Sequence, residues 1–310
     1  MQQRPFKQVD VFTTTPYRGN PLAVVLDGSG LSTADMQHFT NWTNLSECTF
    51  LLPPTPQGRA QGADYRVRIF CPGRELPFAG HPTLGSCHAW LEAGGVPRGE
   101  RVVQECGAGL VNIRRGTEIA ATPHPSHAIH PRGAATHMAA QHRGHDLLAF
   151  AAPPLLKSGP LDEAEVTLIA RGLGVTRQDI MAHAWCDNGP HWRGVMLRNA
   201  QQVRALRPDA TVLAGLDLGV IGPQDAGDTQ FEVRAFFPGN NGITEDPVTG
   251  SLNAALAQWL IGAGLAPERY QVSQGTALAR KGRVHIECTT DGSIWVGGAS
   301  VTCVTGTVQL

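Results

Sequence analysis

The sequence predicts a protein of two similar α/β halves that share one site between them. Its 310 residues are about twice the length over which one hydrophobic core usually extends, so two domains are expected. Hydrophobic residues make up 42% of the chain and charged residues only 16%, which provides enough apolar material for two cores. Patterns typical of strands and helices alternate along the chain, and one series of them occurs twice.

The first fifty residues predict strand, turn, strand, helix and strand. Ser32 followed by Asp35 forms an N-cap with an acidic residue at the third helical position, which predicts a helix over Thr33–Thr43. A turn rich in Pro and Gly precedes the second strand. Alternating or continuous apolar residues predict the strands Lys7–Phe12, Leu22–Leu26 and Cys48–Leu52.

An internal repeat is the most informative feature of the sequence. Each copy has a strand (YRVRIF or FEVRAF), a Pro-Gly turn, a polar loop and an apolar helix that ends in Trp-Leu. The copies are Tyr65–Leu91 and Phe231–Leu260, about half the chain apart. We interpret them as a duplicated domain, whose pseudo-twofold axis would make His81 face Asp246 across a cleft. The alternative is that strand, turn and helix recur by chance, as they do in many α/β proteins.

The repeat divides the chain into an N-terminal lobe, residues 1–121, and a C-terminal lobe, residues 147–299, and the strand at about 300–310 is expected to return to the first lobe. Between them lies a stretch, residues 122–146, with six histidines among Pro, Ala and Gly: His124, His127, His130, His137, His142 and His145. A metal-binding tract is one interpretation, although the spacings match no common zinc pattern. An insertion or linker is the plainer one.

Charge and cysteine content narrow the possible partners. The net charge of -1 and pI near 6.9 give no reason to expect nucleic acid or an anionic membrane surface, so a small molecule is the expected partner. No apolar run approaches the roughly 18 residues that span a bilayer, and the start does not resemble a secretory signal. The seven cysteines include no Cys-x-x-Cys pair, which favours reduced thiols in a cytoplasmic protein.

Glu47 is the candidate acid/base. It lies in NLSECTF, between Leu45 and Phe50, where the predicted helix gives way to a strand. Apolar neighbours disfavour the charged carboxylate and raise its pKa toward neutrality, so that the group can both take and give a proton. A glutamate at a helix end is also often a solvated or capping residue.

His81 and Asp246 are the other two candidate catalytic residues. His81 stands between Gly80 and Pro82, a pattern that lets the backbone approach a ligand and opens a helix. Gly250 and Ser251 open the second helix shortly after Asp246, so both helix starts could hold a carboxylate. Asp246 could instead be a helix cap, and His81 an ordinary loop histidine. Dinucleotide, Walker A, serine-hydrolase and His-Glu-x-x-His motifs are missing from the sequence.

Blocks spread over nearly the whole chain resemble the phenazine-biosynthesis F (PhzF-like) family, whose fold is that of diaminopimelate epimerase. The similar segments are DVFTTTPYRGNPLAVV, NLSECTF, RIFCPGRELPFAGHPTLG, CDNGP, GITEDPVTGS and VTGTVQL. The resemblance implies an α+β protein with two domains related by a pseudo-twofold axis. Each is a bent, mostly antiparallel sheet around a central helix, here the helices after Gly85 and Gly250. A homodimer is also implied.

The resemblance further implies an isomerase that needs neither a metal nor an organic cofactor. In the family's well-understood member, the residue matching Glu47 moves a proton between ring carbons of trans-2,3-dihydro-3-hydroxyanthranilate, while those matching His81 and Asp246 orient and assist. Our leading hypothesis is therefore a cofactor-independent isomerase of a small carboxylate, with Gly80, Gly250 and Ser251 binding the substrate.

Two alternatives remain at the level of sequence. Epimerases and racemases of this fold use two facing cysteines, but Ala79 stands where the first is expected, and Asp246 lies in the matching region of the second half. The second alternative is a protein that binds a small ligand without turning it over. Cysteine alkylation and exchange of a carbon-bound proton with deuterated water would distinguish these possibilities.

Overall fold

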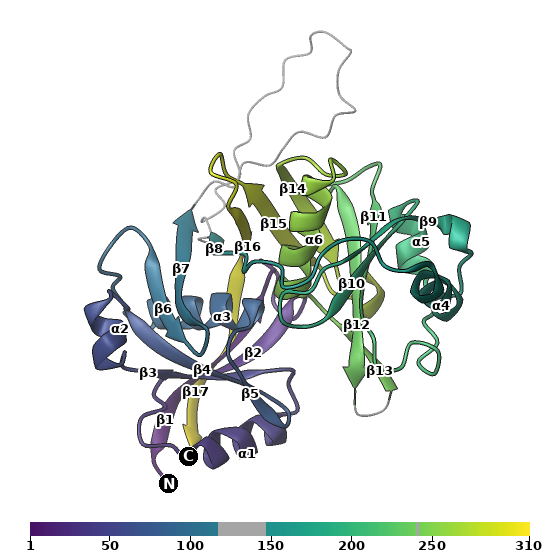
Figure 1. Ribbon diagram of the computed structural model, residues 1–310. Helices are drawn as coiled ribbons and strands as arrows, with labels where there is room; N and C mark the ends of the chain where they lie inside the picture. Colours follow the sequence, from purple (N-terminus) through teal and green to yellow (C-terminus); the bar gives the residue numbers. More distant parts are fainter. Residues whose placement is uncertain (117–146, 240–241) are drawn as a thin grey trace, which may run out of the picture.

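The computed structural model describes residues 1–116, 147–239 and 242–310 and shows a mixed α/β protein that is mostly sheet (Figure 1). The His-rich stretch, residues 122–146, lies outside the described residues. Up to β8 the elements are β1 (Gln3–Val11), β2 (Asn20–Val25), α1 (Thr33–Thr43), β3 (Cys48–Leu52), α2 (Pro56–Ala60), β4 (Tyr65–Cys71), β5 (Arg74–Leu76), α3 (Gly80–Glu92), β6 (Val102–Cys106), β7 (Gly109–Gly116) and β8 (Leu147–Ala151).

The elements after β8 follow a similar order. They are α4 (Glu163–Leu173), η1 (Arg177–Asp179), β9 (Ile180–Trp185), β10 (Trp192–Leu197), α5 (Ala200–Ala205), β11 (Asp217–Pro223), β12 (Phe231–Gly239), β13 (Gly242–Asp246), α6 (Gly250–Gly262), β14 (Arg269–Gln274), η2 (Thr276–Leu278), β15 (Gly282–Cys288), β16 (Ile294–Gly298) and β17 (Ser300–Gln309). None of the helices within this description is long and apolar enough to cross a membrane.

Helix α1 confirms the capping prediction. The Ser32 hydroxyl accepts a hydrogen bond from the Asp35 amide at 3.1 Å, and the Asp35 carboxylate accepts one from the Ser32 amide at 3.2 Å. Asn44 ends the helix in the left-handed conformation, with φ of 58°. Strand β3 begins at Cys48, so Glu47 lies in the short connection between helix and strand.

Strand pairing follows the same order twice. Strands β1 and β2 pair antiparallel, β2 and β3 parallel, β3 and β4 antiparallel, β4 and β6 parallel, and β6, β7 and β8 antiparallel. Strands β9, β10, β11, β12, β14, β15 and β16 repeat these pairings in the same sequence. An antiparallel pairing of β8 with β16 joins the two series. The boundaries of two separate lobes stay a prediction.

The two helices inside the repeat change which residues of its two copies are equivalent. Helices α3 and α6 both have 13 residues and both begin at a glycine, Gly80 and Gly250. His81 is therefore equivalent to Ser251 rather than to Asp246, and α3 begins a turn earlier than Gly85. The physical reason is Pro82, whose fixed φ and missing amide suit the first turn of a helix.

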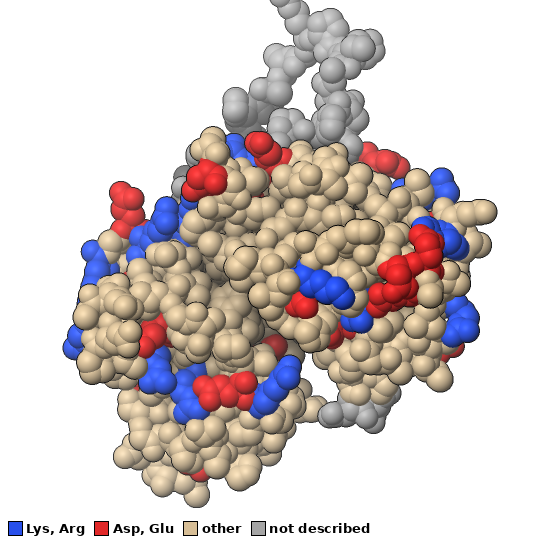
Figure 2. Space-filling model, viewed as in Figure 1, with Lys and Arg blue, Asp and Glu red and all other residues tan. Residues whose placement is uncertain are grey.

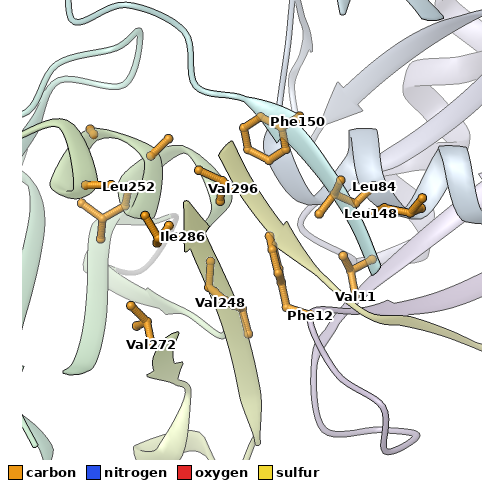
Figure 3. Close-up of a cluster of buried hydrophobic side chains, with 14 of the residues drawn as sticks. Val11, Phe12, Leu84, Leu148, Phe150, Val248, Leu252, Val272, Ile286 and Val296 are labelled. Carbon is orange, nitrogen blue, oxygen red and sulfur yellow. The ribbon is translucent and has the colours of Figure 1, made fainter. Parts of the chain in front are cut away.

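The hydrophobic core is continuous between the two series of strands. In Figure 3, Leu84 of α3 and Phe150 of β8 lie on one side of Val296 of β16, and Leu252 of α6 lies on the other. All four side chains are buried. The starts of α3 and α6 also touch, since a Cβ atom at Gly250 would lie 3.1 Å from the Gly80 Cα. Glycine at both positions permits this close approach.

Charged side chains of both signs are interspersed over the face drawn in Figure 2. This distribution agrees with the formal net charge of -1. Lys and Arg stand close to Asp and Glu in several places, as in the pairs of Arg68 with Glu75 and of Arg177 with Glu163. Exposed pairs of this kind contribute little stability each, so the core and the sheet pairings hold the fold.

Candidate active site

The structure brings Glu47, His81 and Asp246 together, from three different parts of the chain. The Glu47 Oε2 atom lies 3.4 Å from His81 Nε2. Asn20 connects the other side of the imidazole to the aspartate: its Nδ2 atom donates to Asp246 Oδ1 at 2.9 Å and lies 3.4 Å from His81 Nδ1. All four side chains therefore form one continuous polar group.

Each predicted residue is held by the end of a secondary-structure element. Glu47 precedes β3, His81 lies in the first turn of α3, and Asp246 ends β13, shortly before α6. Strand β13 pairs antiparallel with β12, with Asp246 opposite Ala235. Rigid elements on both sides thus fix the three backbones, and the functional groups come within contact distance of one another and of Asn20.

Glu47 and His81 carry buried polar atoms without a hydrogen-bond partner. The side chains keep 18% and 5% of their accessible surface, yet Glu47 Oε2 and His81 Nε2 are themselves buried and unpaired within the described part of the chain. The 3.4 Å between these two atoms is a contact rather than a well-formed hydrogen bond. Leaving such atoms unpaired costs roughly 1–3 kcal/mol each, which makes them available to a ligand.

Burial shifts the pKa values of these groups toward neutral forms. Desolvation raises the pKa of Glu47 to about 7, against a smaller lowering by a hydrogen bond from Ser46. Desolvation likewise raises the pKa of Asp246 to about 6, opposed first by His81 and assisted by the charge of Glu47. The pKa of His81 falls to about 4, mainly through burial. Near pH 7 the imidazole is therefore neutral, and Glu47 is divided between its two protonation states.

Asn20 belongs to this candidate site but was not predicted from the sequence. It lies where the sequence predicts the turn before the second strand, but in the structure it begins β2 and is completely buried. Asp10 fixes the preceding turn, since its Oδ2 atom accepts hydrogen bonds from the amides of Arg18 at 2.7 Å and Gly19 at 2.9 Å. The available signal was its place in the RGNPLAVV block.

A buried network around Asp246 was also missed. Thr249 Oγ1 donates to Asp246 Oδ2 at 2.6 Å. Gln274, on β14, donates to Thr249 Oγ1 at 2.9 Å and to the Asp246 carbonyl at 3.2 Å, and its Oε1 atom accepts from the Thr249 amide and from Asn253. No local pattern marks Gln274 because its partners lie far away in sequence.

The starts of α3 and α6 differ from those of the other α-helices described. Side chains cap α1, α2, α4 and α5, the capping residues being Ser32, Thr55, Asp162 and Asn199. Neither α3 nor α6 has a side-chain cap within the described residues. Free first-turn amides carry partial positive charge, so two such ends in contact are suited to hold a carboxylate.

Ser251 and the CDNGP segment meet at the start of α6. The Ser251 hydroxyl accepts a hydrogen bond from Trp192 Nε1 at 3.2 Å, and the Ser251 carbonyl accepts one from Asn188 Nδ2 at 2.8 Å. The loop between β9 and β10 is thereby attached to the helix that holds Gly250. Both segments had been singled out in the sequence, but their contact is visible only in three dimensions.

Ala79 and Thr249 occupy equivalent positions, immediately before the first residues of α3 and α6. All seven cysteines belong to the described residues, and none is at either position. Cys48, beside Glu47 in sequence, is buried, and desolvation raises its pKa to about 11. These helix starts therefore present no facing pair of thiols.

Two further findings concern the surroundings. In residues 1–116, 147–239 and 242–310, no three His, Cys, Asp or Glu side chains are grouped so as to hold a metal ion.

A hollow of about 450 Å³ lies near the other end of α6, lined by residues that include Gln258, Cys288 and Ile294. It contains none of the six predicted site residues and is separate from the group around Glu47.

Comparisons with known proteins agree with this architecture. A family model described as "Phenazine biosynthesis-like protein" matches residues 9–306. A trans-2,3-dihydro-3-hydroxyanthranilate isomerase of Pseudomonas aeruginosa is 31% identical over 280 residues, covering 89% of this chain and 87% of that protein. The protein named antisense-enhancing sequence 1 of Schizosaccharomyces pombe is 33% identical over 321 residues, covering 99% of both chains.

A crystal structure of a PhzF-family phenazine biosynthesis protein from Bacillus anthracis has the same fold, with a TM-score of 0.78, 21% identity and complete coverage of both chains. The relatives named isomerases define an isomerase, and the solved structures give it the diaminopimelate epimerase-like fold. Within that class the chain belongs to the phenazine biosynthesis-like, or PhzF, family, because the match extends over nearly its whole length.

Proposed function

We propose that the protein moves a proton at a carbon atom of a small carboxylate substrate, with Glu47 as general acid and base. The observation that carries the proposal is the state of the Glu47 carboxyl. Its Oε2 atom is buried and unpaired in the described chain, and burial raises its pKa to about 7. A group with such a pKa takes and returns a proton efficiently at neutral pH.

His81 and Asp246 have supporting roles in this proposal. Neutral His81 points a ring nitrogen toward Glu47 and can hydrogen-bond to the reacting part of a substrate. Asp246, held by Thr249 and Asn20, stabilises positive charge that develops on the imidazole. The uncapped helix starts at Gly80 and at Gly250–Ser251 bind the substrate carboxylate and so orient the carbon next to Glu47.

For the substrate we propose a compound like trans-2,3-dihydro-3-hydroxyanthranilate. The name of the Pseudomonas aeruginosa relative gives this compound as its substrate. It carries the carboxylate that the helix starts would hold. The reaction needs only a proton shuttle between carbons, so we propose that it proceeds without metal or organic cofactor. Dialysis against a chelator should leave the rate unchanged, whereas a loss restored by a metal ion would contradict this part.

The test is turnover of trans-2,3-dihydro-3-hydroxyanthranilate in deuterated water, followed by NMR. Wild-type protein should convert the compound and incorporate deuterium at carbon. Glu47→Gln should lower the rate by about 10²–10⁴-fold, the usual contribution of general acid–base catalysis, while ligand affinity measured by calorimetry persists. Glu100→Gln, at an exposed position, is the matched control and should leave the rate unchanged.

Different outcomes reject different parts of the proposal. A Glu47→Gln protein that keeps most of its rate would rule out Glu47 as the acid/base. Binding of the compound without any exchange would indicate a ligand-binding protein. Loss of activity on cysteine alkylation, prevented by ligand, would favour the thiol chemistry of racemases over a carboxylate.

Assembly and location are part of the same proposal. Family resemblance supports a homodimer, and seven cysteines without a Cys-x-x-Cys pair support a cytoplasmic location. Light scattering on purified protein should give twice the chain mass of 33.0 kDa. A monomer mass at micromolar concentration would reject the dimer.

A further inference from the structure

We infer that Asn20 is a positioning residue that holds the His81 ring with its proton on Nε2 and links the imidazole to Asp246. The inference rests on the proposed function, since it concerns the same site, but its test does not depend on catalysis by Glu47. Asn20 is fully buried and belongs to β2, whereas Asp246 ends β13. One amide therefore connects residues from distant parts of the chain.

The orientation of the Asn20 amide is fixed by two oxygen acceptors. Its Nδ2 atom lies 2.9 Å from Asp246 Oδ1 and 2.9 Å from the Val248 carbonyl oxygen. Turning the amide over would place Asn20 Oδ1 against both oxygens, and neither could supply a proton while Asp246 is ionised. The side of Asn20 that faces His81 is consequently the donating NH₂ group.

This orientation determines the tautomer of the neutral imidazole. Asn20 Nδ2 lies 3.4 Å from His81 Nδ1, and a proton on Nδ1 would set two N–H groups against each other. The proton therefore resides on Nε2, which faces Glu47 Oε2 at 3.4 Å. Both hydrogens of the Asn20 amide point to the closer oxygens, so Asn20 acts on His81 mainly by excluding a proton from Nδ1.

The position of Asn20 is itself tightly determined. A Cβ atom at Gly19 would lie 2.1 Å from the Val11 carbonyl oxygen, so the chain can enter β2 in this conformation only with glycine there. Asp10 holds the amides of Arg18 and Gly19, and Arg280 Nη1 donates to the Gly19 carbonyl at 3.2 Å. Asn20 is thus supported from β1 and from the segment after η2. Its side chain has little freedom to turn away from His81.

The consequence is chemical: His81 presents a hydrogen-bond donor to Glu47 and to any ligand beside it. The opposite tautomer would present an acceptor and would repel an ionised Glu47. Holding the donor form therefore keeps the imidazole compatible with both protonation states of Glu47. Asn20 therefore acts through His81: it is completely buried, and its amide contacts the Nδ1 side of the ring.

The experiment is ¹⁵N NMR of protein labelled on histidine, in which shifts of the two ring nitrogens distinguish the tautomers. A His81→Gln variant identifies the His81 signals. Wild-type protein at pH 7 should show a protonated Nε2 and a bare Nδ1. Asn20→Ser should give a mixture of tautomers, and Asn20→Asp should move the proton to Nδ1, because a carboxylate accepts where the amide donated.

The charged groups near His81 are Glu47, Asp246 and Asp10, and Asn20→Asp adds a fourth carboxyl. The histidine should then titrate at higher pH than in wild type. Asn253→Ser is the matched control: Asn253 is also a buried asparagine, but it bonds the Thr249 carbonyl and Gln274 instead of His81. The control should keep the wild-type tautomer.

A wild-type ring protonated on Nδ1 would overturn the inference, and so would Asn20→Ser protein that retains the single Nε2–H form. If Asn20→Asp fails to fold, the Asn20→Ser spectrum decides. Should Asn253→Ser scramble the tautomer as well, general loosening of the loop would replace the specific role of Asn20. Repeating the measurement in Glu47→Gln protein separates this result from the catalytic proposal.

Discussion

The two sides of the site are built differently. On one side Glu47 and His81 keep buried atoms unpaired within the described chain. On the other side Asp246, Thr249 and Gln274 belong to a network in which the carboxylate and both ends of the Gln274 amide are hydrogen-bonded. We infer that the unpaired atoms of the first side are available to a ligand, while the hydrogen-bonded network of the second side holds the site rigid.

Removing Gln274 should produce the largest loss of stability. Gln274→Leu would leave the Thr249 amide, the Asn253 side chain and the Thr249 hydroxyl without their buried partner. We expect the free energy of unfolding to fall by about 3 kcal/mol, measured by urea denaturation. Gln201→Leu, on the exposed face of α5, should change it by less than about 0.5 kcal/mol. An equal effect at both positions would contradict the comparison.

Removing the charge of Glu47 should stabilise the fold, in contrast to Gln274→Leu, and the gain should depend on pH. Because the folded-state pKa is raised from 4.5 to about 7, wild-type stability falls as pH rises through this window. The glutamine of Glu47→Gln cannot ionise. The free energy of unfolding of this variant should therefore exceed that of wild type by an amount that grows with pH, reaching roughly 2–3 kcal/mol at pH 8. Urea midpoints at several pH values measure the difference. A difference that stays constant with pH would mean that the carboxylate is not desolvated.

Separating the two helix starts should have an intermediate effect. Gly250→Ala would place a Cβ atom 3.1 Å from Gly80 Cα and 3.3 Å from the His81 amide nitrogen. We expect a loss of about 1–3 kcal/mol from overpacking, together with weaker carboxylate binding. Gly262→Ala is the control at the other end of α6, where no atom lies within 4 Å of the added Cβ. Its stability should be unchanged or slightly higher, and thermal unfolding would compare the two.

Removing a side-chain contact where the two series of strands join should have the smallest effect on the free energy of unfolding. The Arg114 guanidinium carbon lies 3.7 Å from the centre of the Trp295 ring, and its Nη1 atom lies 3.6 Å from Glu287. Arg114→Ala should cost about 1 kcal/mol in urea unfolding without altering the tautomer of His81. A loss as large as that of Gln274→Leu would show that the junction, rather than the Asp246 network, holds the site together.

Local signals allowed much of the fold to be predicted from sequence. The N-cap pair Ser32 and Asp35 predicted the start of α1, and the apolar run after Glu47 predicted β3 with its observed bounds. Local signals were weaker where two interpretations competed. The resemblance implied a central helix after Gly85, but Pro82 already favours the first turn, so α3 begins at Gly80.

The site could be predicted only in part. Glu47, His81 and Asp246 each stand in a short pattern with a chemical meaning. The repeat predicted that His81 faces Asp246, although α3 and α6 make His81 equivalent to Ser251, and the family resemblance implied that Glu47 acts beside them. Asn20 and Gln274 have ordinary strand neighbours, and their partners are separated from them by the fold rather than by a motif. Long-range hydrogen bonds of this kind leave no periodicity or spacing in the sequence, so only coordinates reveal them.

Strand β17 has a consequence for the way the chain is made. It pairs along β1 from Gln3 opposite Gln309 to Val11 opposite Ser300. During synthesis the side of β1 that pairs with β17 therefore stays uncovered until almost the whole chain has been made. An uncovered edge strand can pair with strands of other chains. Until β17 emerges, β1 can pair on one side only, with β2.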